Sequence, residues 1–210
     1  MSTTFAAATV EPLADYYRWQ SLLYDWTRWA FLFGRQRLVS KLAATLPPPK
    51  RILEIGCGTG TNMLRLAEAF PTAHILGVDL SPHMLAIARR KLARFGDRVS
   101  VQPCAYEAPL GGSDGYDIIV VSYALSMMNP GYEAVLSACQ KDMSPRGVIA
   151  VVDFHDSRWA WFRRWMGMNH VRMERQLWAR LQTAFTTERC EVHRAYGGLW
   201  RWMLFLGRAK

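Results

Sequence analysis

The sequence predicts an α/β fold: a Rossmann-like, doubly wound sheet of seven strands, with helices at the N-terminus and an antiparallel hairpin at the C-terminus. Between residues 51 and 152, short apolar segments alternate with segments of helical periodicity, which is typical of parallel strands joined by helices. The segment at residues 116–122 is nearly all apolar, as expected for a strand buried on both faces. Near the C-terminus, two strand-like segments flank Gly197 and Gly198, which predicts a hairpin.

Proline residues help to define the expected helices. The three prolines at residues 47–49 cannot continue the helix before them, and Ser81 followed by Pro82 is a typical helix start. The expected strands are residues 51–55, 73–78, 99–102, 116–122, 147–152, 191–196 and 199–206. The expected helices are residues 14–33, 34–46, one ending at residue 70, one from residue 82 to about 96, residues 132–143 and, as one long or broken helix, residues 157–185.

A chain of 210 residues, half of them hydrophobic, is long enough for one domain with a substantial core. We expect no secretory signal and no membrane span, because the longest apolar segment falls short of the roughly 20 residues that a span requires. The four cysteines form no CxxC pair, which favours reduced thiols in the cytosol. The expected parts of the single domain 1–210 are a helical lid at 1–47, a cofactor-binding core at 50–153, a helical insertion rich in tryptophan and arginine at 157–186, and the hairpin at 190–207.

Charge and tryptophan are concentrated in the two ends of the chain. The net charge is +9, and residues 51–150 hold nine basic and nine acidic side chains, so that the excess lies outside them. All nine tryptophans also lie outside this middle region. Arginine interleaved with tryptophan suits a membrane surface or a nucleic acid. The alternative is that tryptophan fills the core and that a bias in base composition supplies the arginine.

The segment from Glu54 to Gly60 is the strongest chemical signal. An apolar strand ends in Glu54 and leads directly into Gly56, Gly58 and Gly60 before a helix, so the backbone can approach a ligand closely. A dinucleotide fingerprint requires glycine where Thr61 stands, and no Walker lysine follows. Glu54 could accept a hydrogen bond from an ammonium group. The turn alone leaves a nicotinamide cofactor, a flavin and S-adenosylmethionine open.

The pattern E-x-G-x-G-x-G, with Asp79 ending the next expected strand, resembles the class I S-adenosylmethionine-dependent methyltransferases. The resemblance implies that the glycines make room for the methionine part of the cofactor and that Asp79 accepts both ribose hydroxyls. Cys104 stands where the family often has aspartate beside the adenine, so only backbone or packing contacts are implied for Cys104 and Ala105. The predicted cofactor-binding residues in this core are Glu54, Gly56, Gly58, Gly60, Asp79, Leu80, Met84, Cys104, Ala105 and Ser122.

Segments outside the core resemble the bacterial betaine-lipid N-methyltransferases, which convert diacylglyceryl homoserine to its trimethylated betaine. They are residues 15–35, 161–172 and 196–201. This resemblance implies a cytoplasmic enzyme, peripherally associated with the inner face of the cell membrane, that works with a homoserine-lipid synthase. Related phospholipid and quinone methyltransferases share only the core and the tyrosine–aspartate element at residues 24–25.

Methyl transfer to an amine requires alignment of the nucleophile and exclusion of water, and aromatic faces can hold an increasingly methylated ammonium. Tyr16, Tyr17, Tyr24 and Tyr123 are therefore candidates to line the acceptor pocket. Tyr17, Tyr24 and Arg28 fall on one stripe of the first expected helix and are predicted to bind the cofactor; Arg28 could instead bind the substrate carboxylate. The alternative for this stripe is a surface helix whose tyrosines only pack.

The predicted catalytic residues are Tyr16, Tyr123 and His155. His155 follows the fifth expected strand and could relay the amine proton, although a lone histidine is more often structural. The histidines and cysteines have no ligand spacing, so no metal is expected. Tryptophan and arginine within residues 158–180 suit a helix on a surface of anionic lipids, and the alternative is a helix that merely covers the sheet.

Three other functions remain as alternatives to methylation of diacylglyceryl homoserine. The first is methylation of phosphatidylethanolamine or of a quinone ring. A nucleic-acid methyltransferase is disfavoured, because Ser122-Tyr123-Ala124-Leu125 lacks the Asn/Asp-Pro-Pro-aromatic motif of many enzymes that methylate base amines, and no nucleic-acid partner is expected. A protein that binds the cofactor without turnover is the third.

Overall fold

The computed structural model describes residues 31–111, 114–128, 131–168, 171–173 and 175–210, and the elements discussed below belong to the unit Gly34–Lys210. Most of the expected helix at residues 14–33 lies outside the described residues. No helix of the described part of the chain is long and apolar enough to cross a membrane.

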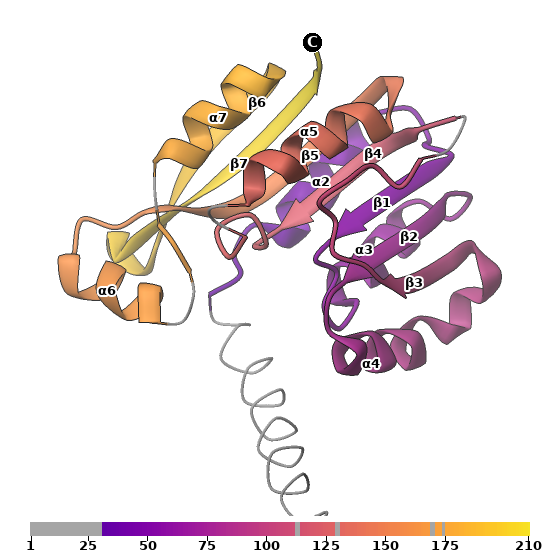
Figure 1. Ribbon diagram of the computed structural model, residues 1–210, viewed down its shortest axis with the longest axis horizontal. Coiled ribbons are helices and arrows are strands. Elements are labelled where there is room, and N and C mark those ends of the chain that lie inside the picture. Colours follow the sequence, from indigo (N-terminus) through magenta and orange to yellow (C-terminus); the bar gives the residue numbers. More distant parts are fainter. Residues whose placement is uncertain (1–30, 112–113, 129–130, 169–170, 174) are drawn as a thin grey trace, which may run out of the picture. The chain divides into compact units, whose positions relative to one another are not determined.

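Seven strands form one sheet in the order β3-β2-β1-β4-β5-β7-β6 (Figure 1). Strands β1 to β5 run parallel, and β7 is antiparallel to both of its neighbours. The predicted fold class is thereby confirmed. The strands are β1 (Arg51–Ile55), β2 (His74–Asp79), β3 (Val99–Pro103), β4 (Tyr116–Ser122), β5 (Met143–Asp156), β6 (Phe185–Ala195) and β7 (Trp200–Ala209).

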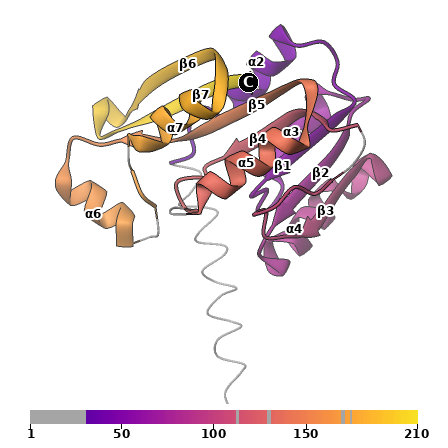
Figure 2. The same cartoon turned by 45° about the horizontal axis from the view of Figure 1, so that its top comes forward.

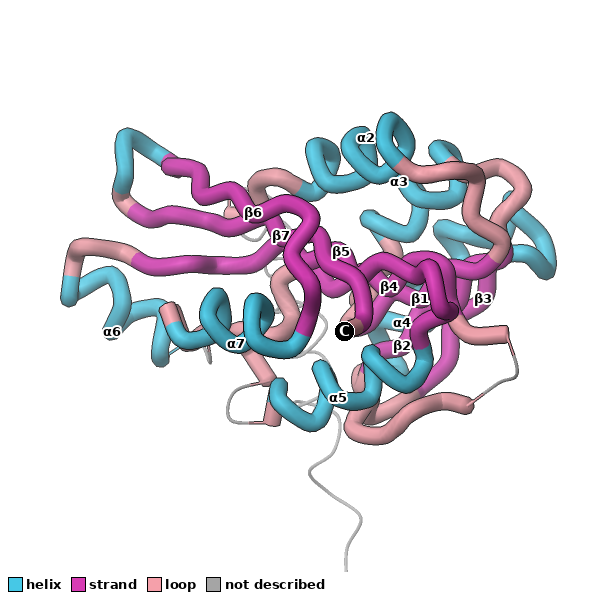
Figure 3. The backbone as a smooth tube through the Cα atoms, turned by 90° about the horizontal axis from the view of Figure 1, so that it is seen from above, coloured by secondary structure: helices cyan, strands magenta, loops and turns pink. Residues whose placement is uncertain are grey.

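Helices cover both faces of the sheet. In Figure 3, α2 and α3 lie on one face, and α5 and α7 lie on the other. Helix α4 contacts α3. The helices are α2 (Arg35–Thr45), α3 (Thr61–Ala69), α4 (Pro82–Leu92), α5 (Tyr132–Asp142), α6 (Ala160–Met168) and α7 (Gln176–Ala184), with 3₁₀ turns at Ala93–Arg98 and Tyr196–Gly198.

The central strands are almost completely buried, which explains their apolar sequences. Leu53 and Ile55 of β1, and Ile119 and Val121 of β4, have no more than trace exposure and belong to one core cluster. The strand order changes direction between β1 and β4, because β2 and β3 lie on one side of this pair and β5 lies on the other. Ligands of open α/β sheets bind at the carboxyl ends of the strands that flank this switch point.

The C-terminal half differs from the expectation in its boundaries. Strand β5 is 14 residues long and exceeds the predicted 147–152 at both ends. Strand β6 begins at Phe185, six residues before the predicted start at residue 191, because it pairs with β7 along its whole length. The sequence gives no signal for this extension, because residues 186–189 are polar and exposed on β6, an outermost strand of the sheet. The helical pattern at residues 157–185 is broken into α6 and α7.

Candidate functional site

The glycine-rich turn between β1 and α3 has two crowded glycines and one that faces open space. Gly56, Gly58 and Gly60 all have positive φ angles, of 67°, 54° and 72°. A Cβ atom on Gly56 would lie 2.7 Å from the Cβ of Ala124, and one on Gly60 would lie 3.0 Å from Leu92 Cδ1. A Cβ on Gly58 would meet no atom within 4 Å. The turn therefore leaves its backbone accessible to a ligand at Gly58.

Asp79 ends β2 beside this turn. Its Oδ2 accepts a hydrogen bond from the Gly58 amide at 2.8 Å, and its Oδ1 accepts one from the Ser81 amide at 2.9 Å. An ionised carboxylate has about four acceptor positions, so each oxygen can also accept a hydroxyl group. This geometry suits a vicinal diol such as the two hydroxyls of a ribose.

Glu54 is a buried carboxylate with one unsatisfied oxygen. Its Oε1 accepts a hydrogen bond from Asn62 Nδ2 at 3.0 Å, whereas Oε2 is buried and has no hydrogen-bond partner among the described residues. Burial raises the pKa of Glu54 to about 7, although the Asn62 hydrogen bond and the Arg35 guanidinium both lower it. A bound ammonium group would satisfy Oε2 and stabilise the ionised carboxylate.

The other residues predicted to bind the cofactor follow β2 and β3, and those after β3 are the ones predicted to lie beside the adenine. Leu80 is 69% exposed directly after Asp79, so its side chain is available as an apolar platform. The amide of Met84 donates to the Ser81 hydroxyl at 3.3 Å, and the amide of Cys104 donates to the Asp79 carbonyl at 3.1 Å. Ala105 follows Cys104 and is exposed. The two segments are thus joined at the same edge of the sheet, and their contacts with a ligand stay predictions.

Arg35, at the start of α2, is a residue for which sequence reasoning gave no role. Its Nε donates to the Ser122 hydroxyl at 2.8 Å, and its guanidinium carbon lies 5.8 Å from the centre of the Tyr123 ring. Arg35 thus places a cation at the end of β4, and its positive charge lowers the pKa of Glu54 at the end of β1. Its position depends on where α2 packs, and a single sequence carries no signal for that packing.

Tyr123 lies at the predicted position after β4, with its side chain buried. Its φ of 56° is strained for a residue other than glycine, and such strain is concentrated at functional sites. Its ring is 1% exposed and meets Phe154 edge to face at 4.8 Å. Burial raises its pKa well above 10, with Asp153 adding to the shift, so the phenol stays protonated at neutral pH. A direct contact with the substrate nitrogen stays a prediction.

The end of β5 carries His155 and a charged cluster. Burial lowers the pKa of His155 below 6.5, so its imidazole is neutral at pH 7. Its Nδ1 is buried without a hydrogen-bond partner in the described part of the chain. The neighbouring Asp156 accepts hydrogen bonds from Arg175 at 2.8 Å and from Arg201, which ties α7 and β7 to the end of β5. A catalytic role for His155 stays a prediction.

Replacing Asp156 by alanine should destabilise the fold by about 2 kcal/mol, because a buried carboxylate with three charge-assisted hydrogen bonds from two arginines is lost. These hydrogen bonds lower the pKa of Asp156 below 3.8, so its contribution is present above that pH and is lost as the pH falls through the folded pKa. Urea unfolding at pH 7 measures the difference. Glu188→Ala, which breaks the more exposed pair with Arg208, is the matched control and should cost about 0.5 kcal/mol. Equal losses in the free energy of unfolding for the two variants would contradict the stabilising role of Asp156.

Four predicted site residues, Tyr16, Tyr17, Tyr24 and Arg28, lie outside the described residues. Within the described ranges, no group of three or more histidine, cysteine, aspartate or glutamate side chains is placed to hold a metal ion.

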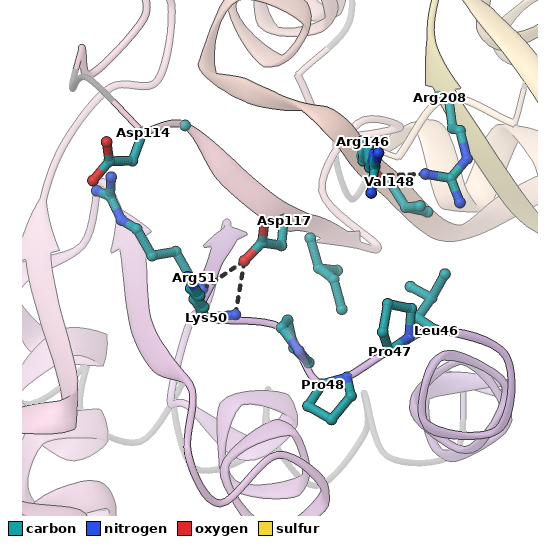
Figure 4. Close-up of a pocket in the computed structure, with 13 residues that line it drawn as sticks. Leu46, Pro47, Pro48, Lys50, Arg51, Asp114, Asp117, Arg146, Val148 and Arg208 are labelled. Atoms are coloured by element: carbon teal, nitrogen blue, oxygen red, sulfur yellow. Dashed lines mark hydrogen bonds between the residues drawn. The ribbon is translucent and has the colours of Figure 1, made fainter.

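A pocket of about 500 Å³ lies at the opposite edge of the sheet, at the amino ends of β1, β4 and β5. Figure 4 shows Asp117 there, where its Oδ2 accepts hydrogen bonds from the amides of Lys50 at 2.7 Å and Arg51 at 3.1 Å. Asp117 thus binds backbone amides as Asp79 does, but at the other end of the strands. The pocket is separate from the glycine-rich turn.

The fold and the turn can now be compared with known proteins. Residues 53–149 match a family model described as a methyltransferase domain. The trans-aconitate 2-methyltransferase of Variovorax paradoxus is 34% identical over 119 residues, which are 56% of this chain and 44% of that protein. The demethylmenaquinone methyltransferase of Thermus thermophilus is 35% identical over 108 residues, which are 50% of this chain and 48% of that protein. The chain thus spans about half the length of these relatives.

A solved structure shares the fold. The N-methyltransferase NodS of Bradyrhizobium japonicum, in complex with S-adenosyl-L-homocysteine, aligns with a TM-score of 0.68 and 20% identity over 84% of this chain and 86% of that one. The residues described above fit S-adenosylmethionine: the open glycine at Gly58, the acceptor positions of Asp79 and the unsatisfied oxygen of Glu54. The predictions of a methyltransferase and of S-adenosylmethionine as its cofactor are confirmed at this level. Residues 53–149 therefore resemble a methyltransferase domain, and the sheet that they belong to has the fold of an N-methyltransferase that binds S-adenosyl-L-homocysteine.

Proposed function

We propose that this protein is an N-methyltransferase that converts the amine of diacylglyceryl homoserine to the trimethylated betaine. The bound cofactor supplies an electrophilic methyl group on sulfur, and the protein aligns the acceptor nitrogen and excludes water. A cofactor held by Glu54 and Asp79 would direct this methyl group toward the ends of β4 and β5. Those ends carry Tyr123, the described candidate for the acceptor pocket, and His155, the candidate proton relay.

One observation carries the choice of substrate. Two of the segments that resemble the betaine-lipid enzymes lie about 30 residues apart in the sequence, yet they pack together at the end of β5. Phe162 of α6 stacks on Trp200 with ring centres 5.5 Å apart, and Arg201 pairs with Asp156. The residues that resemble the betaine-lipid enzymes thus pack together at the carboxyl end of β5, which supports a shared role for them in the proposed function.

The acceptor amine has to be neutral before it can attack. A model amine of this type has a pKa of about 8 to 10, and the positive charge of the cofactor would lower it. His155 is suited to accept the released proton, because its imidazole is neutral at pH 7. The inferred role of Arg35 is different: its fixed positive charge can bind a carboxylate, which both the cofactor and the homoserine head group possess.

Expression of the protein in a host that also makes diacylglyceryl homoserine tests this proposal. We expect mass spectrometry of the extracted lipids to show the trimethylated product together with mono- and dimethylated intermediates. A host expressing the Asp79→Ala variant is the control and should contain only the unmethylated lipid. Absence of every methylated form with the wild-type protein would contradict the proposal.

A quinone is the second candidate acceptor, and the similarity to a demethylmenaquinone methyltransferase favours it. Phosphatidylethanolamine is the third, since it presents a primary amine on a lipid without a carboxylate. Purified protein supplied with each lipid separately distinguishes the three. We expect turnover of the homoserine lipid to exceed that of the other two, and methylation of the quinone alone would replace the proposal.

A further inference from the structure

Helix α6 has two apolar faces, and only one of them is buried. Phe162 and Met166 point inward and are almost completely buried. Trp161, Trp165 and Met168 are 62%, 42% and 68% exposed. Their spacing of four and three residues places these three side chains on the outer side of the helix, where the rings of Trp161 and Trp165 also meet Phe162 at 5.7 and 5.8 Å between centres. A large part of each of these three apolar side chains is therefore left exposed by the packing of α6 on the fold.

Basic side chains border the outer face of α6. Residues 157–173 contain four arginines and no acidic residue. The guanidinium of Arg158 lies 4.6 Å from the centre of the Trp159 ring, which is 41% exposed. Arg164 is exposed on the helix itself, whereas Arg163 is tied to the Ser157 carbonyl at 2.5 Å. We use the term α6 surface for Arg158, Trp159, Trp161, Arg164, Trp165 and Met168.

The α6 surface lies at the edge of the sheet that carries the cofactor turn. Strands β1, β4 and β5 are parallel, so the glycine-rich turn, Tyr123 and the segment leading into α6 all follow carboxyl ends at one edge. The amide of Arg172, after α6, donates to the Ser126 carbonyl at 3.0 Å and so joins this segment to the loop after β4. Figures 1 and 2 both show α6 at one end of the sheet, near the turn between β6 and β7.

We propose that the α6 surface docks on a lipid bilayer that contains anionic lipids. Trp161, Trp165 and Met168 enter the boundary between head groups and acyl chains, and Arg158 and Arg164 meet lipid phosphates. Charge complementarity and exposed apolar volume on one helix face together favour a bilayer. A single-stranded nucleic acid instead requires a basic groove with rings on which bases stack. This inference deepens the proposed function, on which it rests for its biological purpose, since docking would bring the acceptor edge to a lipid amine.

Co-sedimentation with vesicles of phosphatidylcholine, with and without phosphatidylglycerol, tests the docking without any amine that the enzyme could methylate. We expect the wild-type protein to sediment with the anionic vesicles and to be released by high salt. Trp161→Ala with Trp165→Ala should lower the partition coefficient on the order of tenfold, because two inserted rings lose apolar burial. Arg158→Ser with Arg164→Ser should lower it by about fivefold for each arginine, equivalent to roughly 1 kcal/mol each.

Lys50→Ser with Arg146→Ser is the matched charge control, because both residues line the pocket at the opposite edge of the sheet. This variant should sediment as the wild type does, and circular dichroism should show that all variants are folded. Unchanged binding by the folded tryptophan variant, or equal losses in the control, would overturn the proposal. Binding to single-stranded RNA without vesicle binding would also overturn it.

Turnover of the homoserine lipid in detergent micelles separates this inference from the proposed function. Wild-type vesicle binding without micellar turnover would overturn the proposed function and leave the docking surface in place.

Discussion

Asp79→Ala is expected to weaken the binding of S-adenosylmethionine by roughly a hundredfold or more, about 3 kcal/mol, because the two ribose hydroxyls lose a charged acceptor. Isothermal titration calorimetry measures this loss directly. The alanine also removes the acceptor of the Gly58 and Ser81 amides, so part of the effect could arise from a loosened turn.

Asp117→Ala is the matched control for this effect. Asp117 also accepts hydrogen bonds from two backbone amides and from the Ser144 hydroxyl, but it lies at the opposite edge of the sheet. The Asp117→Ala substitution should lower the free energy of unfolding about as much as Asp79→Ala does. It should leave the cofactor affinity within about twofold of the wild type. If Asp79→Ala bound the cofactor normally, the ribose would have to lie elsewhere.

Glu54→Gln is expected to remove most of the pH dependence of cofactor binding. The pKa of Glu54 in the free protein is about 7, and a bound ammonium group favours the ionised carboxylate. Below pH 7, binding must therefore release a proton, so the wild-type affinity should rise with pH, by up to tenfold per unit, and level off above pH 8. The neutral glutamine cannot ionise, and at pH 8 the variant should bind about thirtyfold more weakly.

Two measurements isolate Glu54 from other titrating groups. The amine of the cofactor also titrates, but it does so equally for both proteins, so the difference between their pH profiles belongs to Glu54. The stability of the free protein gives an independent check. Because the folded pKa of Glu54 is raised from 4.5, the wild-type free energy of unfolding should fall as the pH rises from 4.5 to 7, and the Gln variant should lack this component. Parallel profiles for the two proteins would show that Glu54 does not meet the ammonium group.

The glycine-rich turn and the central strands could be predicted from the sequence because their signals are local. The apolar strand and the three spaced glycines are contiguous, the acid ends the next apolar strand, and backbone geometry leaves these features few alternatives. Gly58 and Asp79 accordingly lie together as expected. The predicted start of β6 was wrong because its first residues lie at an exposed edge, where pairing with β7 requires no alternation of apolar side chains.

The parts of the site that depend on packing could not be predicted in the same way. Arg35 reaches Ser122 over 87 positions of sequence, and this distance is closed only by the packing of α2 against the sheet. The burial of Tyr123 follows from its left-handed backbone and from its contact with Phe154 on the neighbouring strand. Neither the backbone conformation nor this contact can be derived from the sequence pattern. The sequence likewise predicted a long or broken helix over residues 157–185, but not which of its tryptophans remain exposed.

Transfer of labelled methyl groups by the purified protein tests the central claim most directly. The protein is incubated with S-adenosylmethionine labelled in its methyl group and with diacylglyceryl homoserine in anionic vesicles, and the lipid is analysed by mass spectrometry. The account predicts a lipid that carries three labelled methyl groups on its nitrogen. A protein that binds the cofactor at Gly58 and Asp79 but leaves the lipid unlabelled would contradict it.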